Sequence, residues 1–369
     1  MELADQPELP LPAPPGHGLD GRGDGLIGLE ISAGLAEGEG LEGTAGAPPE
    51  VALRSLDTLW FQVGGTLCNL ACTHCFISCS PTKHTHEMMR LEQVLRYLRE
   101  AVELGVKEFY FTGGEPFLNP EMEAILAATL AVGPASVLTN GLLLDAARCA
   151  RLAALAAASP YSLDLRVSLD GYDAASNDAV RGAGTFERVL AGLRHLAAAG
   201  LNPVVTVTEV CAEAAVDSGK QRFFALLDGL GLTRPRLKVL PVFKIGAEAQ
   251  RAGGYESWQR LRDGELPLIA PAAIAAPASS AAPDPPAAPP ASTAPSLSAA
   301  PAAPEAAGWD HLQCSSCRMV TDQGVWVCPI LVNEPAARMG ETLADALGPY
   351  PLRHAACWTC HVHGVSCRT

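Results

Sequence analysis

The chain has 369 residues, of which 48% are hydrophobic, and carries a formal net charge of −14. This length accommodates one large domain or two smaller ones. An acidic balance argues against nucleic acid as the main partner, because nucleic-acid-binding surfaces need clustered basic residues. Much of the charge is local, since residues 1–50 contain ten acidic residues and one basic residue.

Twelve cysteines are the most unusual feature of the composition. The start of the sequence shows no basic and apolar pattern of a signal peptide, and no run of about 18 apolar residues offers a membrane span. In a large protein without export signals, clustered cysteines indicate metal binding rather than disulfides. We therefore expect a cytoplasmic protein with no membrane partner.

Changes in composition divide the chain into four parts. Residues 1–50 are rich in Gly, Pro and acidic residues, which predicts a disordered N-terminal segment. Residues 266–308 are mostly Ala, Pro and Ser, which predicts an extended linker. Between these segments lies a body, residues 51–265, and after the linker comes a cysteine-rich tail, residues 309–369.

The body alternates between strand and helix patterns. In chain order, the expected strands are 59–63, 108–112, 136–139, 163–168, 203–210 and 236–240, and the expected helices between them include 91–102, 120–131, 145–158 and 186–196. This alternation, about six βα units, predicts an α/β fold with a parallel sheet that is either open or curled into a partial barrel.

Three cysteines follow the first expected strand with the spacing CxxxCxxC: Cys68, Cys72 and Cys75. Three clustered thiolates leave a four-iron cluster one ligand short, so one iron stays open to a reactive ligand. A structural metal site instead closes its shell with four protein ligands. Zinc with His74 as the fourth ligand is the alternative, but His74 is adjacent to Cys75, which makes convergence on one ion awkward. We therefore predict an iron–sulfur cluster.

Three further motifs stand where later strands end. Gly113-Gly114-Glu115-Pro116 follows the second strand, Thr139-Asn140-Gly141 ends the third, and Ser168-Leu169-Asp170-Gly171 ends the fourth. In parallel α/β folds and barrels, the C-terminal strand ends carry the active site. These motifs and the cysteines are therefore expected to meet at one rim.

Each of these motifs also has a purely structural interpretation. Gly113 and Gly114 suit a tight turn, whereas Glu115 beside a cluster can hold a ligand ammonium group. Asp170 can bond a ribose hydroxyl or make an Asx-turn. Arg181 can hold a carboxylate or remain a solvated surface charge.

Taken together, these residues resemble the radical S-adenosylmethionine (SAM) superfamily over nearly all of residues 55–250. The resemblance implies a partial (β/α)6 TIM-like barrel, a [4Fe–4S] cluster on Cys68, Cys72 and Cys75, and SAM on the open iron. The SAM contacts that it implies are Gly113, Gly114 and Glu115 at the amino group, Ser168 and Arg181 near the carboxylate, and Asp170 near the ribose. No adenine contact can be carried over to residues 203–209.

The tail contains six cysteines, which are Cys314, Cys317, Cys328, Cys357, Cys360 and Cys367. Their pattern is similar to the small C-terminal auxiliary-cluster domains called SPASM or twitch, which implies metal ligation by these thiols. Full SPASM extensions have seven cysteines, and the spacing after Cys360 departs from theirs. One auxiliary iron–sulfur cluster is the leading expectation.

Two other interpretations of the tail stay open. A zinc ribbon would use the pairs Cys314/Cys317 and Cys357/Cys360. The stretch from Cys357 to His361 also has the form of a c-type haem attachment motif, although haem attachment usually requires export. Three remaining cysteines, Cys79, Cys149 and Cys211, are expected to be core or surface thiols.

The resemblance implies a radical SAM enzyme. A flavodoxin or ferredoxin-like donor would reduce the cluster, SAM would be cleaved to methionine and a 5′-deoxyadenosyl radical, and the radical would abstract hydrogen from a substrate. A peptide or protein is the first expectation for the substrate, because SPASM-type tails often accompany such modification. The alternatives are a small molecule, such as a sugar or cofactor precursor, and a non-catalytic iron–sulfur scaffold or electron carrier.

Overall fold

The computed structural model describes residues 47–210, 216–232, 234–262, 309 and 311–364. Most of the expected N-terminal segment, the expected linker, Cys211 and Cys367 lie outside these ranges.

One sheet of nine strands organises the described part of the chain, in the order β10-β9-β8-β2-β3-β4-β5-β6-β7. Six neighbouring parallel strands come from the body: β2 (Thr58–Phe61), β3 (Glu108–Phe111), β4 (Ala135–Thr139), β5 (Leu163–Ser168), β6 (Val204–Thr208) and β7 (Arg236–Leu240). Among the described strands, the two edges, β10 and β7, do not pair with each other. The α/β fold with a partial barrel is therefore confirmed.

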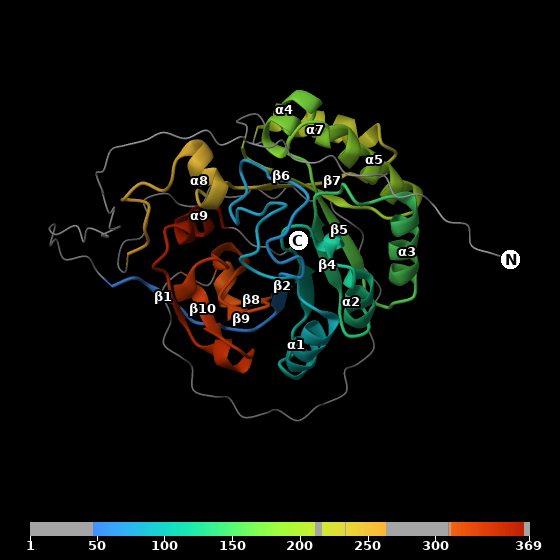
Figure 1. Ribbon diagram of the computed structural model, residues 1–369. Coiled ribbons are helices and arrows are strands. Elements are labelled where there is room, and N and C mark those ends of the chain that lie inside the picture. The colour runs from blue at the N-terminus through green and yellow to red at the C-terminus, as the bar shows by residue number, and fades with distance from the viewer. Residues whose placement is uncertain (1–46, 211–215, 233, 263–308, 310, 365–369) are drawn as a thin grey trace, which may run out of the picture. The chain divides into compact units, whose positions relative to one another are not determined.

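Helices connect these strands. They are α1 (Leu91–Glu103), α2 (Met122–Thr129), α3 (Ala146–Ala157), α4 (Ala174–Arg181), α5 (Thr185–Ala198), α7 (Asp217–Asp228) and α8 (Gly246–Ala252). Figure 1 shows α1, α2 and α3 along one side of the sheet, next to β2–β5. None of the helices in the described ranges is long and apolar enough to cross a membrane.

Two hydrophobic clusters form because side chains alternate across each strand. Leu59 and Phe61 point to an outer cluster, which they share with the buried faces of α1, α2, α3 and α5. Trp60, between them, points to an inner cluster and stacks on Tyr110, with 4.4 Å between the ring centroids. The inner cluster also contains Cys68 and most of the described tail cysteines, so both sets of thiols lie on the same side of the sheet.

The tail continues the sheet of the body. Strand β8 (Cys317–Thr321) pairs in parallel with β2, and β9 (Gly324–Trp326) and β10 (Arg338–Gly340) follow antiparallel. Every residue of β8 is buried. Pairing with β8 satisfies the backbone groups that β2 would otherwise leave open at an edge.

Two smaller elements complete the tail. Strand β11 (Tyr350–Pro351) pairs antiparallel with β1 (Glu50–Val51), and α9 (Ala356–His363) closes the described chain. Short 3₁₀ helices connect these pieces: η2 (Gln313–Ser315), η3 (Pro329–Leu331), η4 (Pro335–Ala337) and η5 (Ala344–Leu347). One further 3₁₀ helix, η1 (Pro116–Leu118), lies in the body after β3.

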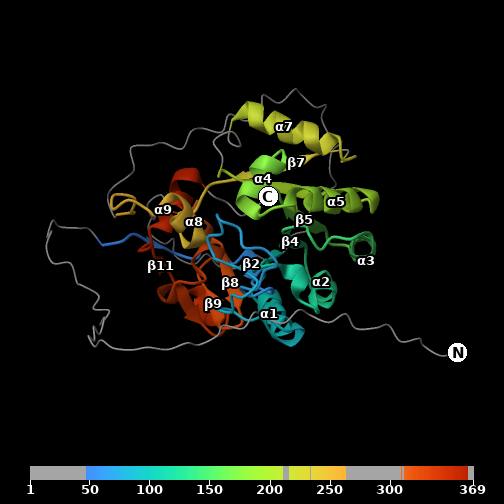
Figure 2. The same cartoon turned by 45° about the horizontal axis from the view of Figure 1, so that its top comes forward.

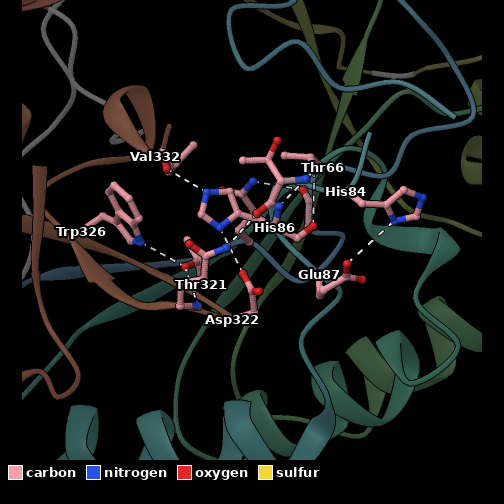
Figure 3. Close-up of polar contacts among 12 residues, drawn as sticks. Thr66, His84, His86, Glu87, Thr321, Asp322, Trp326 and Val332 are labelled. Carbon is pink, nitrogen blue, oxygen red and sulfur yellow. Dashed lines mark hydrogen bonds and ion pairs between the residues drawn. The ribbon is translucent and has the colours of Figure 1, made fainter. Parts of the chain in front are cut away.

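His86 makes a second link between body and tail (Figure 3). Its side chain is 2% exposed, and its two ring nitrogens lie 3.0 Å from Asp322 Oδ1 and 2.8 Å from the Val332 carbonyl oxygen. The ring also meets Trp326 edge-on. On the body side, the His86 carbonyl accepts from the Thr66 backbone N–H at 2.9 Å. His86 therefore ties the loop that begins the cysteine motif to the tail.

We expect His86→Ala to lower the free energy of unfolding by roughly 2–4 kcal/mol, because it removes a buried ring together with its contacts to the Asp322 carboxylate, the Val332 carbonyl and Trp326. Urea denaturation at neutral pH measures the effect. His84→Ala is the control: the His84 side chain is 58% exposed, so its loss should change stability by no more than about 0.5 kcal/mol. Equal midpoints for the two variants would contradict the role given to His86.

Candidate functional site

The Gly-Gly-Glu segment after β3 packs directly against the start of the cysteine loop. The backbone N–H groups of Gly114 and Glu115 donate to the carbonyls of Gly65 and Leu67, at 2.9 and 3.0 Å. A Cβ on Gly114 would collide with the Leu67 carbonyl, so only glycine permits this approach. The glycine is therefore required to position the loop, whatever ligand the site binds.

The Glu115 carboxylate has partners other than the expected ammonium group. It is 0% exposed and accepts hydrogen bonds from the Phe117 N–H, the Thr139 hydroxyl and the Asn140 N–H, at 2.8–3.1 Å. Burial raises the pKa of Glu115, and these donors oppose that shift. Glu115 thus joins the end of β3 to the end of β4 from inside the protein.

Cys68 lies buried beside the end of β4. The Asn140 side-chain amide is 3.7 Å from the Cys68 sulfur and donates to Asn69 Oδ1 at 2.7 Å. Burial raises the pKa of the Cys68 thiol to about 12. The motif Thr139-Asn140-Gly141 is visible in the sequence, but the sequence predicts no role for Asn140. Its position after a strand was the only available signal.

Cys75 has a close neighbour in Cys79. The Cys79 backbone N–H lies 3.3 Å from the Cys75 sulfur, and the Cys79 thiol also donates to it, which together lower the pKa of Cys75 to about 6. A bound iron needs a thiolate, so Cys75 is the best prepared of the three ligands. Cys79 is buried, as expected of a core thiol, yet it contacts the motif directly.

Asp170 connects the cysteine loop to α4. One carboxylate oxygen, Oδ2, lies 2.9 Å from His74 Nε2 and 2.7 Å from Arg181 Nε, and the other accepts from the Thr208 N–H at 2.7 Å. Burial alone would raise the pKa of Asp170, but Arg181 and His74 outweigh it and hold that pKa well below its usual range. His74, considered above as a zinc ligand, is thus engaged by a carboxylate.

Arg181 also acts on the motif itself. Burial raises the pKa of Cys72 to about 11, and the nearby positive charge of Arg181 opposes that rise. The structure therefore brings Arg181 and Asp170 to the cysteine loop, which the common rim predicted for Asp170. Ser168 ends β5 two residues before Asp170 and is half-buried.

We expect Asp170→Asn to lower the free energy of unfolding by roughly 3–5 kcal/mol at neutral pH, because it leaves the buried Arg181 charge unpaired. Asp217→Asn is the control, since Asp217 is exposed and its ion pair with Lys220 spans 3.5 Å. A carboxyl group whose pKa is lowered by folding stabilises the folded state at pH values above its unfolded-state pKa, which is about 3.9 for Asp. The difference in stability between the wild type and Asp170→Asn should therefore shrink as the pH falls below that value. Denaturant titrations at pH 7 and pH 3 measure both effects, and an Asp170→Asn variant as stable as the control would refute the pairing.

The donor chemistry of the loop fits an iron–sulfur cluster. Cys68, Cys72 and Cys75 act on one another electrostatically, which places the three thiols in one neighbourhood. Within the described ranges, no three His, Cys, Asp or Glu side chains are arranged to hold one metal ion. A cubane differs from a single ion because it spreads its ligands over separate irons.

Four tail cysteines line one pocket on the inner side of the sheet: Cys314, Cys328, Cys357 and Cys360. The rest of its wall is mainly apolar, with Leu312, Val327 and Ile330 among the lining residues. Burial raises the pKa of Cys314 to about 12 and also raises those of Cys328 and Cys357. A cluster of buried thiols in an apolar wall fits a metal centre that holds them as thiolates.

The expected ligand set of the tail is only partly brought together. Cys317 begins β8 and is not among the residues that line the pocket, whereas Cys328 is. A zinc ribbon would need both Cys314 and Cys317 beside Cys357 and Cys360, but Cys317 does not line this pocket. His361, from the haem-like motif, lies in α9, where its Nδ1 meets His311 Nε2 at 3.0 Å.

A family model described as the radical SAM superfamily matches residues 63–211, the stretch that holds the cysteine loop, the Gly-Gly-Glu segment, Asp170 and Arg181. Over these residues the chain is similar to the radical SAM superfamily. Members of this superfamily are enzymes that use a [4Fe–4S] cluster together with SAM.

Two curated relatives are similar over part of the chain. GTP 3′,8-cyclase of Synechococcus sp. (strain CC9902) is 38% identical over 149 residues, covering 37% of this chain and 41% of that protein. Mycofactocin maturase MftC of Mycobacterium ulcerans (strain Agy99) is 37% identical over 134 residues, covering 36% of this chain and 34% of that protein. The chain thus spans less than half the length of these relatives.

Among solved structures, Streptococcus suis SuiB bound to its precursor peptide SuiA is similar with a TM-score of 0.45 and 17% identity. That match covers 56% of this chain and 44% of SuiB.

Proposed function

We propose that this protein is a radical SAM enzyme that holds a [4Fe–4S] cluster on Cys68, Cys72 and Cys75 and removes hydrogen from a peptide or protein substrate. The observation that carries the proposal is the place of the CxxxCxxC loop: it follows β2 at the strand-end rim of a parallel sheet, inside the region matched by the family model. When bound, the cluster and SAM supply a 5′-deoxyadenosyl radical, which side chains alone cannot generate.

The chain contributes binding and orientation. The Gly113–Glu115 segment positions the loop through its backbone, and we assign the SAM amino group to this strand end rather than to the buried Glu115 carboxylate. We assign the SAM carboxylate to Ser168 and Arg181. The inner cluster around Trp60 provides an apolar surface that limits the access of water to a radical.

A ribose contact at Asp170 is compatible with its present hydrogen bonds. A carboxylate oxygen can accept about two hydrogen bonds. Oδ2 is filled by His74 and Arg181, but Oδ1 receives only the Thr208 N–H. One acceptor position on Oδ1 therefore remains for a ribose hydroxyl.

We further propose one auxiliary iron–sulfur cluster, bound by the four cysteines that line the tail pocket. These four cysteines come from η2, the start of η3 and α9, and the fold of the tail brings them together. An electron donor of the flavodoxin or ferredoxin class would supply the reducing electron for the first cluster.

The peptide substrate rests on the SPASM-like pattern of the tail. The similarity to GTP 3′,8-cyclase does not favour a small-molecule substrate over a peptide, because it covers 37% of this chain and the similarity to mycofactocin maturase MftC covers 36%.

The test is to incubate anaerobically reconstituted, reduced protein with SAM and to measure 5′-deoxyadenosine by chromatography. An enzyme forms it, whereas an iron–sulfur scaffold or electron carrier does not. Adding GTP in one reaction and a library of short peptides in another separates the substrate classes. Stimulation by GTP alone would overturn the peptide substrate, and no 5′-deoxyadenosine in any reaction would overturn the enzyme.

A further inference from the structure

The Asn140 side chain lies directly after β4, beside the first cysteine of the loop, and is 7% exposed. Its Oδ1 accepts the Leu142 backbone N–H at 3.0 Å, which makes a local Asx-turn. A backbone N–H can only donate, so this contact fixes which end of the Asn140 amide is the oxygen. The Nδ2 group is therefore the end that meets Cys68 and Asn69.

Both hydrogens of the Asn140 Nδ2 group have an acceptor. Nδ2 lies 2.7 Å from Asn69 Oδ1 and 3.7 Å from the Cys68 sulfur, which is itself buried. The contact to sulfur is the longer one because the sulfur atom is larger than oxygen. A cluster ligand must be a thiolate, so this amide is aimed at an atom that carries negative charge when the cluster is bound.

A buried carboxylate holds the backbone of Asn140. The Asn140 N–H donates to Glu115 Oε2 and the Thr139 hydroxyl donates to Glu115 Oε1, both at 2.8 Å. Glu115 is 0% exposed, so these bonds do not compete with water. Because its backbone and its side chain are both fixed, Asn140 loses little conformational freedom when the cluster binds, which is the condition for a preorganised donor.

We propose that Asn140 is a positioning residue for the cluster of the cysteine loop: its amide holds the Cys68 sulfur in place and raises the reduction potential of the cluster. This inference rests on the cluster assigned above to Cys68, Cys72 and Cys75. A hydrogen bond draws negative charge away from a sulfur ligand, and reduction adds negative charge, so the bond favours the reduced form.

The test compares Asn140→Ser and Asn140→Asp with Asn202→Ser in the full chain. Serine and aspartate can both accept the Leu142 N–H and so keep the local turn. Neither offers an amide to Cys68, because the serine side chain ends one atom short of Nδ2 and aspartate carries an acceptor there. Asn202 is the control: it is exposed, precedes β6, and its amide donates to the Arg234 carbonyl at 3.2 Å.

Iron and sulfide are measured per chain after anaerobic reconstitution, and the midpoint potential is measured by a redox titration followed by electron paramagnetic resonance. Each sample is recorded with and without SAM. Only a cluster with an open iron can bind SAM, so the signal that changes belongs to the loop cluster and not to the tail. Circular dichroism checks that each variant is folded.

We expect N202S to match the wild type in iron content and in potential. N140S should show at least a tenfold shift of the loop cluster toward the oxidised form, which is a potential lower by about 59 mV for a one-electron couple. N140D should shift further, because its carboxylate adds negative charge beside the cluster.

A wild-type potential in N140S would overturn the inference, since a residue that only supports the fold of the loop changes stability and leaves the potential as it was. If N140S does not fold or loads no iron, N140D decides by the same criterion. A wild-type protein without any signal that responds to SAM would instead refute the cluster on Cys68, Cys72 and Cys75.

Discussion

We expect the variant with Cys68, Cys72 and Cys75 all replaced by Ala to form no detectable 5′-deoxyadenosine from SAM and to retain the fold. These thiols lie in a loop after β2 rather than in a strand or helix, so their loss removes the cluster ligands without opening the outer core. The measurement is product formation by reduced, reconstituted protein, with circular dichroism as the check on folding. Activity should fall to background, because the radical has no other source in the chain.

Cys149→Ala is the matched control for this variant. Cys149 is fully buried in α3 within the outer core, away from the motif, so its loss should cost some stability and leave SAM cleavage intact. A triple variant that still cleaved SAM would show that the cluster is held elsewhere.

The second large effect is expected in the tail. Reconstituted wild-type protein should hold more than four irons per chain, and the triple variant should keep the excess. Replacing Cys314, Cys328, Cys357 and Cys360 together by Ala should remove that excess, because these four thiols line one pocket. Iron and acid-labile sulfide, measured on the purified protein, report the change directly.

Cys317→Ala distinguishes the ligand sets in the same assay. Cys317 does not line the pocket, so this variant should keep the excess iron, whereas a ribbon built on Cys314 and Cys317 would lose its metal. A tail that binds zinc without sulfide, or a wild-type protein that stops at four irons, would rule out the auxiliary cluster.

Local patterns in the sequence were enough to predict the parallel α/β body. Strand β5 (Leu163–Ser168) and β7 (Arg236–Leu240) have the predicted bounds, and the other body strands differ by only a few residues at their ends. This works because a buried parallel strand needs a short apolar run, and the helices between need an apolar face, both of which depend on residues close together in the chain. The meeting of motifs at one rim also follows, because parallel strands end at the same edge.

The partners of individual side chains could not be read in the same way. Glu115 reaches Thr139 and Asn140, and His74 reaches Asp170, through contacts between residues that are distant in sequence. A motif shows that an acidic residue stands at a strand end. It does not show whether the carboxylate faces a ligand or the interior, because that depends on which donors the folded chain places nearby.

The cysteines of this protein illustrate both cases. The spacing of Cys68, Cys72 and Cys75 was sufficient to predict that the three thiols share one loop, because all three lie within a segment of eight residues. Only the tertiary structure decided that Cys328 rather than Cys317 lines the pocket and that β8 pairs with β2. They depend on how the tail docks on the edge of β2, and docking is determined by surfaces that form only after the sheet has folded.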